Sequence, residues 1–219
     1  MSARTGLRRV FVDSPDSLGG RSRARRSRWM LDTFPDLANM TVIDLGGRLG
    51  SWRDLPVRPA RVHVVNLEEP DGEVPDWAVV DRADLNDLPP AIAGGRYDLV
   101  YSNSVIEHVG GFALRERFAE TVADLADRHW VQTPYRYFPI EPHRLFPGFQ
   151  FLPLPARATV ARHWPLSHSP PGDREAAVRL ALDVELLTRT EMRLLFPHSE
   201  ILTERVAGAP KSLIAVKRT

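Results

Sequence analysis

Short apolar segments recur along the first 134 residues, each bounded by glycine, proline or polar residues. Their aliphatic and β-branched composition is typical of strands buried on both faces. An intervening segment instead repeats its apolar residues at helical spacing. The predicted strands are 41–45, 61–67, one within 74–85, 97–104 and 129–134, and the predicted helix is 111–127. Strands that alternate with helices predict an α/β protein with a mostly parallel sheet.

The pattern changes after the fifth predicted strand. Residues 134–171 are rich in proline and aromatic residues and follow neither period, so we expect a lid packed on the sheet. Residues 174–187 have a helical pattern, and Thr188 and Glu191 form a predicted capping box that opens another helix. Two short strands, 200–206 and 212–218, close the chain.

The N-terminal segment has a different character. Residues 1–20 suggest a loose arm, and the five arginines of 21–28 run into a short helix predicted from Met30, Leu31 and Phe34, which Pro35 ends. We therefore divide the chain into an N-terminal arm and helix, 1–37, and a main domain, 38–219, with the lid at about 134–185.

Charge and composition narrow the classes of function. The chain of 219 residues has 29 basic and 28 acidic residues, and this balance argues against a protein that coats nucleic acid or a membrane surface. The absence of cysteine excludes disulfides and thiolate metal sites. No apolar run approaches the roughly 20 residues needed to span a bilayer, and the first residues do not resemble a secretory signal, so we expect a cytoplasmic protein.

Candidate chemistry begins at the glycine-rich turn after the first strand. Asp44 is the next-to-last residue of this strand, and Gly46, Gly47 and Gly50 follow the strand. Glycines allow a sharp turn and close approach of the backbone to a ligand, and a helix N-terminus offers free N–H groups to an anion. The turn lacks the Gly-Lys-Ser/Thr of a phosphate-binding loop and the spacing of the dinucleotide fingerprint.

Polar residues also follow the next three strands, where a nucleotide-type ligand needs partners for its ribose and base. The carboxyl ends of parallel strands meet at one edge of the sheet, so these residues are expected to lie together. They are Asn66 and Glu68 at the end of the second strand, Asp84 at the end of the third, and Asn103 and Ser104 at the end of the fourth. The apolar Leu85, next to Asp84, is expected to pack on the base.

With these motifs the chain resembles the class I S-adenosylmethionine-dependent methyltransferases over roughly residues 40–219. The resemblance rests on VIDLGGRLG, VVNLEEP, ADLNDLP, YDLVYSNSVIEHV, VQTP and LLTRTEMRLLFP…KSLIAVKR. It implies a Rossmann-like, seven-stranded, mostly parallel sheet with helices on both faces and an antiparallel last strand. It also implies S-adenosylmethionine as cofactor.

The resemblance also assigns roles to single residues. It places Asp44, Gly46 and Gly50 at the amino-acid end of the cofactor, with Gly47 in the same loop, and Asn103 and Ser104 near the sulfonium. It places Asn66 and Glu68 at the ribose, and Asp84 and Leu85 at the adenine. Two departures stand out: Asn66 replaces the acid usual in the family, and Gly47-Arg48 replaces the middle x-Gly of the loop.

Residues 133–144 are similar to a Pro-rich F-P-I-E-P-H segment of a subgroup of bacterial methyltransferases. We expect His143 to act as the general base for an acceptor hydroxyl, with Glu141 orienting it and His108 as a second candidate. The expected substrate-binding residues are Tyr135, Arg136, Tyr137 and Arg144. Glu107, Glu141, His108 and His143 are ligand types for a divalent ion such as Mg²⁺. They show no close ligand spacing, so a metal is considered but not predicted.

The sequence thus predicts O-methylation of a small molecule or saccharide. The alternatives are a lipid, quinone or nitrogen acceptor on the same fold, RNA binding or modification through 21–28, and a non-catalytic cofactor-binding scaffold. We expect no nucleic-acid or membrane partner. A homodimer is compatible with an exposed N-terminal arm.

Overall fold

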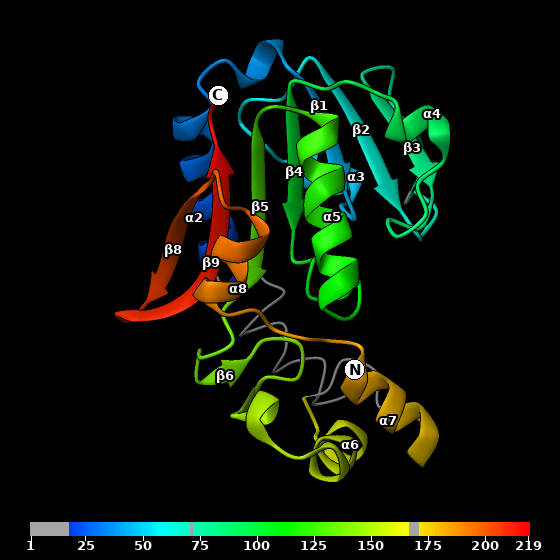
Figure 1. Cartoon of the computed structure of the whole chain (residues 1–219), viewed down its shortest axis with the longest axis vertical. Helices are drawn as coiled ribbons and strands as arrows, with labels where there is room; N and C mark the ends of the chain where they lie inside the picture. Colours follow the sequence, from blue (N-terminus) through cyan, green and yellow to red (C-terminus); the bar gives the residue numbers. More distant parts are fainter. Residues whose placement is uncertain (1–17, 71, 167–170) are drawn as a thin grey trace.

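The computed structural model describes residues 18–70, 72–166 and 171–219, so most of the expected loose arm lies outside the described residues. Its centre is a seven-stranded sheet of order β3-β2-β1-β4-β5-β9-β8 (Figure 1). The strands are β1 (Thr41–Leu45), β2 (Arg61–Asn66), β3 (Ala78–Arg82), β4 (Leu99–Asn103), β5 (His129–Pro134), β8 (Glu200–Val206) and β9 (Ala209–Lys217). This confirms the predicted α/β fold.

Strand direction fixes where a ligand can bind. β1 pairs in parallel with both β2 and β4, and β9 runs antiparallel to its neighbours β5 and β8. The chain winds one way from β1 to β3 and the other way from β4 to β5, so the order reverses between β1 and β4. Ligands of open α/β sheets bind at the carboxyl edge beside such a switch point.

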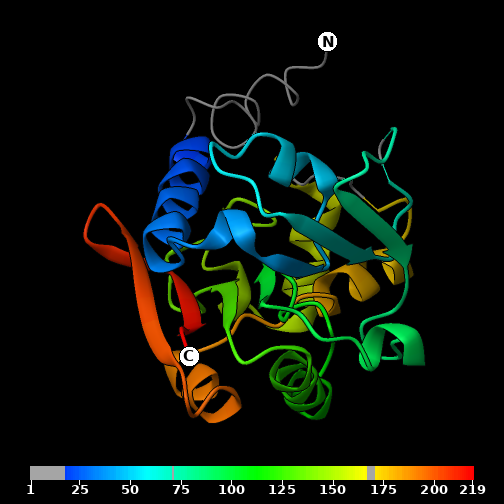
Figure 2. The ribbon, with the colours of Figure 1, turned by 90° about the horizontal axis from the view of Figure 1, so that it is seen from above.

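Helices cover both faces of the sheet, as Figure 2 shows. One face carries α2 (Leu18–Thr33), the short η2 (Leu37–Asn39) and α3 (Leu49–Arg53). The other carries α4 (Pro90–Ala93), α5 (Phe112–Leu125) and α8 (Arg189–Leu195). Each face has its own apolar core, which explains why all six residues of β5 are buried.

The N-terminal helix is longer than the sequence predicted, because α2 includes the arginine run. Met30 and Phe34 join the core of the first face, so α2 packs on the sheet. Upstream of these residues the helix has almost no apolar stripe. This part of α2 is held by ion pairs from Arg25 and Arg26 to the buried Glu204 of β8. The spacing of apolar residues in the sequence does not reveal such a contact between distant segments.

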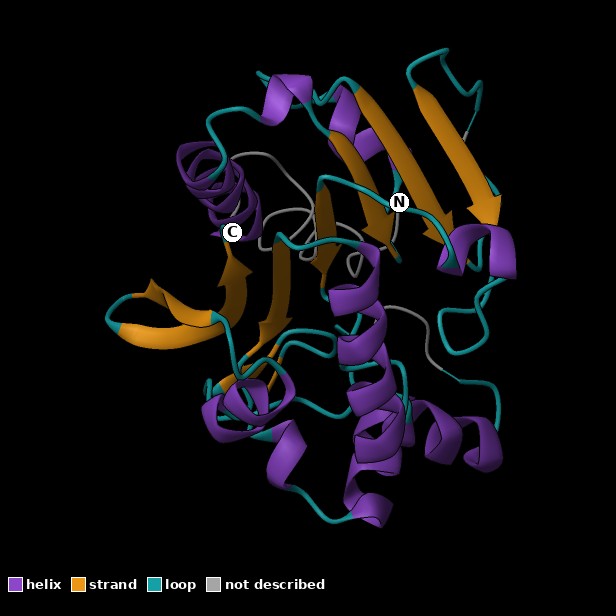
Figure 3. Cartoon of the chain, turned by 45° about the horizontal axis from the view of Figure 1, so that its top comes forward, coloured by secondary structure: helices purple, strands orange, loops and turns teal. Residues whose placement is uncertain are grey.

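The lid lies beyond the carboxyl edge of the sheet (Figures 1 and 3). It contains β6 (Ile140–Glu141), β7 (Phe146–Pro147), η3 (Phe149–Phe151), α6 (Leu154–His163) and α7 (Arg174–Leu182). Helix α6 was not predicted, because Pro153 and Pro155 mask its pattern, although proline is tolerated in the first turn.

One further boundary differs from expectation. The predicted helix covered residues 174–187, but α7 ends at Leu182 and residues 183–187 are not helical. The reason is pairing to other parts of the chain, because Glu185 N–H donates to Glu107 O at 2.9 Å and Arg136 N–H donates to Leu187 O at 3.0 Å. The capping box of Thr188 and Glu191 is confirmed. Among the described residues, no helix has the length and apolar character needed to cross a membrane.

Candidate active site

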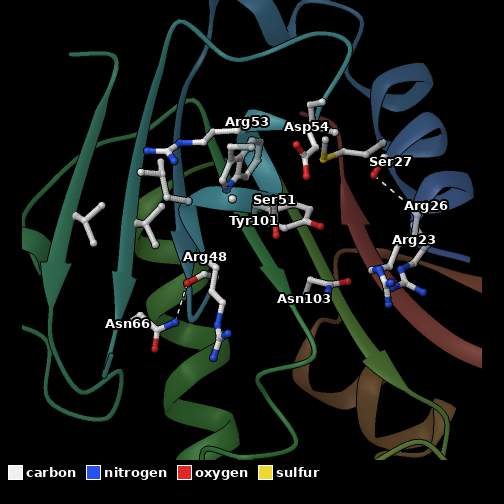
Figure 4. Close-up of a pocket in the computed structure, with 18 of the residues that line it drawn as sticks. Arg23, Arg26, Ser27, Arg48, Ser51, Arg53, Asp54, Asn66, Tyr101 and Asn103 are labelled. Carbon is white, nitrogen blue, oxygen red and sulfur yellow. Dashed lines mark hydrogen bonds between the residues drawn. The ribbon is translucent and has the colours of Figure 1, made fainter. Parts of the chain in front are cut away.

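A cavity of about 1020 Å³ opens at the carboxyl ends of β1, β2 and β4, between the sheet, α2 and α3. Five of the predicted cofactor-binding residues line it: Gly47, Gly50, Asn66, Glu68 and Asn103. Figure 4 shows Asn66 at the end of β2 and Asn103 at the end of β4, with arginines of α2 on the opposite wall. A volume of this size is large enough for a nucleotide-type ligand.

Asp44 is buried beneath the cavity at the end of β1. The indole N–H of Trp52 in α3 donates to its Oδ2 at 2.7 Å, while Oδ1 has no hydrogen-bond partner among the described residues. Burial raises the pKa of Asp44 to about 7, against the opposing effect of the Trp52 bond. The sequence did not single out Trp52, although it lies on the helix that follows the glycine turn.

The three loop glycines have different roles. Gly47 lies against the Asp44 carboxylate, so that a Cβ there would overlap its oxygens. Gly46 has a φ of +78°, and a Cβ would meet Val105 Cγ2 at 2.6 Å. At Gly50 a Cβ would meet nothing within 4 Å. The first two glycines are therefore required by the fold of the loop, and the third leaves open space in the cavity wall.

Asn66 holds this loop in place. Its Nδ2 donates to Gly47 O at 2.6 Å and to Gly46 O at 3.2 Å, and its Oδ1 accepts from Glu68 N–H at 3.2 Å. A carboxylate could not donate to these carbonyls, which gives a physical reason for the departure at this position. Glu68 and Glu69 remain on the cavity wall, where Glu68 forms an ion pair with Arg48.

Sequence reasoning missed the basic wall of the cavity. Arg23, Arg26 and Arg28 of α2 line it opposite the sheet. Arg23 and Arg26 are three residues apart, so they share one helix face. This spacing was visible in the sequence, but the distance from α2 to the glycine loop was not.

Five predicted cofactor-binding residues do not line this cavity: Asp44 and Gly46, which lie in and before the loop described above, and Asp84, Leu85 and Ser104. Asp84 is exposed and its Oδ1 accepts from Asn86 N–H at 2.9 Å, while Leu85 packs against the core on the α5 face. Ser104 has a φ of +60° and lines a second cavity of about 410 Å³, where its Oγ donates to Gln132 Oε1 at 3.0 Å. Cofactor contacts by these five residues stay predictions. The consecutive residues Asn103 and Ser104 thus face different cavities.

The predicted catalytic residues meet in one cluster. Glu107 and His108 come from the loop after β4, and His143 and Glu141 come from the lid. Nε2 of His108 lies 3.1 Å from Nε2 of His143, and Nδ1 of His143 lies 2.6 Å from Glu141 Oε1. Ligand atoms of Glu107, His108 and His143 all lie within 4.8 Å of one another.

Burial and charge act against each other in this cluster. Burial raises the pKa of Glu107, whose Oε2 accepts from Thr133 Oγ1 at 2.9 Å and whose Oε1 has no hydrogen-bond partner among the described residues. Burial lowers the pKa of His143, but the bond and charge of Glu141 outweigh it and the net shift is upward. Burial likewise raises the pKa of Glu141, but the bond and charge of His143 together with the backbone N–H bonds of His143 and Arg144 outweigh it, and the net shift is downward.

The predicted substrate-binding residues lie around the lid. Tyr137 is 57% exposed and stacks on Phe151, with ring centroids 6.0 Å apart, and it makes a T-shaped contact with Tyr135. Arg136 is also exposed. Arg144 is buried and donates to Leu180 O at 3.2 Å, so its guanidinium supports the lid. Substrate contact by these four residues stays a prediction.

No protein-family model matches the sequence, and no curated protein matches it. Solved structures do match. An S-adenosylmethionine-dependent methyltransferase from Mesorhizobium loti is 18% identical, with 91% of this chain and 99% of that chain covered and a TM-score of 0.58.

The N-terminal domain of EvdMO1, with bound SAH, the demethylated cofactor, is 17% identical, with 100% of this chain and 97% of that chain covered and a TM-score of 0.53. Magnesium protoporphyrin IX methyltransferase of Synechocystis, also with bound SAH, is 16% identical, with 97% of this chain and 94% of that chain covered and a TM-score of 0.51. The strand order, the switch point and these likenesses lead to one conclusion. This chain has the fold of the class I S-adenosylmethionine-dependent methyltransferases.

Proposed function

We propose that the protein is an S-adenosylmethionine-dependent methyltransferase that methylates a hydroxyl oxygen of a small molecule or saccharide. The observation that supports this most is the cavity of about 1020 Å³ at the carboxyl edge, formed by the loop after β1 and the ends of β2 and β4. Solved structures of similar fold hold SAH or S-adenosylmethionine.

The lining residues fit the parts of this molecule. Backbone N–H groups at the start of α3 and the arginines of α2 suit its carboxylate. Glu68 and Glu69 are the acceptors available for the ribose hydroxyls, because the Asn66 amide is engaged with the loop. Asn103, at the end of β4, is assigned to the sulfonium end, as the sequence resemblance implies.

The chemistry that S-adenosylmethionine supplies is a methyl group on a positively charged sulfur. A lone pair of the acceptor hydroxyl oxygen forms the new bond to this carbon as the carbon–sulfur bond breaks. The electron pair of the broken carbon–sulfur bond stays on the sulfur and neutralises its charge. The hydroxyl proton must leave, and when no metal ion is bound Nε2 of His143 is the group that we propose takes it. Glu141 holds the opposite ring nitrogen at 2.6 Å and fixes the orientation of the ring.

The acceptor class rests on the surface of the lid. Exposed Tyr137 offers a flat face for sugar C–H groups, and Arg136 offers donors to hydroxyls. The similar EvdMO1 domain was also crystallised in the presence of SAH and D-fucose. A lipid or quinone is the alternative acceptor, because the second cavity beside Ser104 is lined largely by apolar side chains such as Phe138, Ile140 and Leu145.

The structure offers little support for RNA binding through residues 21–28. Arg25 and Arg26 are paired with Glu204, and Arg23 and Arg28 line the cavity, so four of the five arginines already have a place in the fold. The net charge of the chain is only +1. We therefore propose a small-molecule partner in preference to a nucleic acid.

Calorimetry with SAH and S-adenosylmethionine tests the cofactor. We expect micromolar dissociation constants, about −7 to −8 kcal/mol. Asn66→Asp should weaken binding at least tenfold, because it replaces the donor to Gly46 and Gly47 by a carboxylate, whereas Asn39→Asp, on the exposed part of η2, should bind as wild type.

Methyl transfer to panels of saccharides and of apolar alcohols, read by mass spectrometry, tests the acceptor. Absence of both heat and thermal shift with either SAH or S-adenosylmethionine contradicts the proposed cofactor. Transfer confined to apolar alcohols contradicts the saccharide and favours the alternative.

A further inference from the structure

We propose that Glu107, His108 and His143 form a binding site for a divalent cation, at the junction of the sheet and the lid. The placement of the three donor atoms supports the site, and ion binding there does not depend on methyl transfer. Its role toward an acceptor does rest on the proposed function.

The distances suit a shared ion. Two donors bonded to one ion at about 2.1 Å each are roughly 3.0–3.4 Å apart when they are adjacent in its coordination sphere, and at most about 4.2 Å apart. The two Nε2 atoms of His108 and His143 are 3.1 Å apart, and Glu107 Oε1 lies 3.9 Å from Nε2 of His143. Little side-chain movement is needed to close the site.

A carboxylate faces Nδ1 of each histidine, on the side of the ring away from the proposed ion, and this leaves the Nε2 lone pairs directed toward the ion. Nδ1 of His143 faces Glu141 Oε1 at 2.6 Å, and Nδ1 of His108 lies 3.5 Å from Asp183 Oδ2. Each carboxylate favours a proton on the Nδ1 that it faces, which leaves both Nε2 atoms as acceptors pointing at one another. Two acceptors at this distance need a positive group between them, either a proton held by one ring or a metal ion, and carboxylate–histidine–metal chains are the usual arrangement around bound ions.

Glu107 supplies the second, independent observation. Its side chain is fully buried, its Oε2 is bonded to Thr133, and its Oε1 is left without a hydrogen bond and directed at His143. A buried carboxylate oxygen without a partner costs free energy, and a metal ion is one of the few groups that satisfies it.

The donor set indicates the kind of ion. Two imidazoles and one carboxylate favour first-row divalent ions such as Mn²⁺ or Zn²⁺ over Mg²⁺, which prefers oxygen ligands. His108 is one-third exposed and His143 about one-quarter, so the ion would keep a side open to a further ligand.

An acceptor hydroxyl fits that open side. With the ion bound, Nε2 of His143 is a ligand and no longer the proton acceptor. The ion then stabilises the negative charge on the oxygen, and the proton leaves to water on the exposed side. Because His143 and Asp183 belong to the lid and Glu107 and His108 to the sheet side, the ion would also fix the lid on the core.

Titration of the chelator-treated full chain with Mn²⁺, followed by calorimetry and by the EPR signal of free Mn²⁺, tests the site. We expect one ion per chain and a rise in the unfolding temperature on binding. Glu107→Gln and His143→Ala should each lower the affinity at least tenfold. Glu141→Gln, which changes the partner of His143 Nδ1 and removes no proposed ligand, should lower it by roughly 10–100-fold. His163→Ala, on the exposed side of α6, is the matched control and should bind as wild type.

Two results would overturn the proposal. One is the absence of Mn²⁺ and Zn²⁺ binding by wild-type protein, and the other is binding that persists unchanged in Glu107→Gln. SAH binding measured on the same samples keeps this outcome separate from the cofactor, because a protein that binds SAH and no ion contradicts the metal site alone.

Discussion

Gly47 and Gly50 lie three residues apart in one loop but differ in what surrounds them. A Cβ at Gly47 would overlap the Asp44 carboxylate, whereas one at Gly50 would enter open space. We expect Gly47→Ala to lower the free energy of unfolding by roughly 1–3 kcal/mol, as overpacking does. Gly50→Ala, inside α3, should change it by less than about 1 kcal/mol. Urea unfolding of the two variants measures the difference, and equal stabilities would contradict the assigned role of Gly47.

Asp44 makes stability depend on pH. Its folded pKa of about 7 lies above the ordinary 3.8, so the native state holds a proton that the unfolded state releases. The associated stability is complete below about pH 4 and is lost as pH rises through 7. Asp44→Asn keeps an oxygen for Trp52 and has no proton to lose. We therefore expect its stability relative to wild type to rise between pH 4 and 8, by roughly 4 kcal/mol at most.

Unfolding of the ligand-free protein by urea at several pH values measures this difference. Asp32→Asn, on the exposed side of α2, is the control and should stay parallel to wild type. If the curve of Asp44→Asn is also parallel, the carboxyl is ionised in the folded protein and its raised pKa is wrong.

At the scale of elements, α2 is joined to β8 by a buried carboxylate. The Glu204 side chain is fully buried, with Arg26 Nη1 2.9 Å from Oε2 and the half-exposed Arg25 3.3 Å from Oε1. Arg26→Ala removes one of the two arginines that pair with the Glu204 carboxylate, and we expect the free energy of unfolding to fall by about 2–3 kcal/mol. This loss is smaller than that of a fully broken buried pair, because Arg25 remains. Arg25→Ala should cost less than about 1 kcal/mol.

The double variant Arg26→Ala/Glu204→Gln checks the cause of that loss. Removing the carboxylate should recover most of the stability, as measured by chemical unfolding. No recovery would mean that Arg26 acts through packing of its aliphatic stem and not through charge.

At the scale of the whole molecule, the lid brings separate parts of the sequence together. Glu107 and His143 are far apart in the chain, and Asp183 lies further on, yet all three surround His108. Helices on both faces leave the carboxyl edge as the place where strand ends, the lid and α2 converge (Figures 1 and 2). The two cavities open there, on either side of the end of β4.

Local pattern was sufficient for most of the sheet. β1 and β5 begin and end at the predicted residues. Each has adjacent large apolar residues, Val42 and Ile43 in β1 and Trp130 and Val131 in β5, and a glycine or proline marks its end. The glycine loop was also visible, since glycine requirements arise within a few residues of chain. Asn66 was noticed as a departure, but only its bonds to the loop carbonyls explain it.

What depended on the tertiary structure was pairing between distant segments. The sequence determined that Glu107, His108, Glu141 and His143 are candidates, because these side chains follow strands at the carboxyl edge. It could not determine that the two Nε2 atoms face each other, that Glu107 Oε1 is left without a partner, or that α2 forms the cavity wall. Hydrophobic period reports which face of an element is buried, whereas these contacts depend on where the lid and α2 return to the sheet.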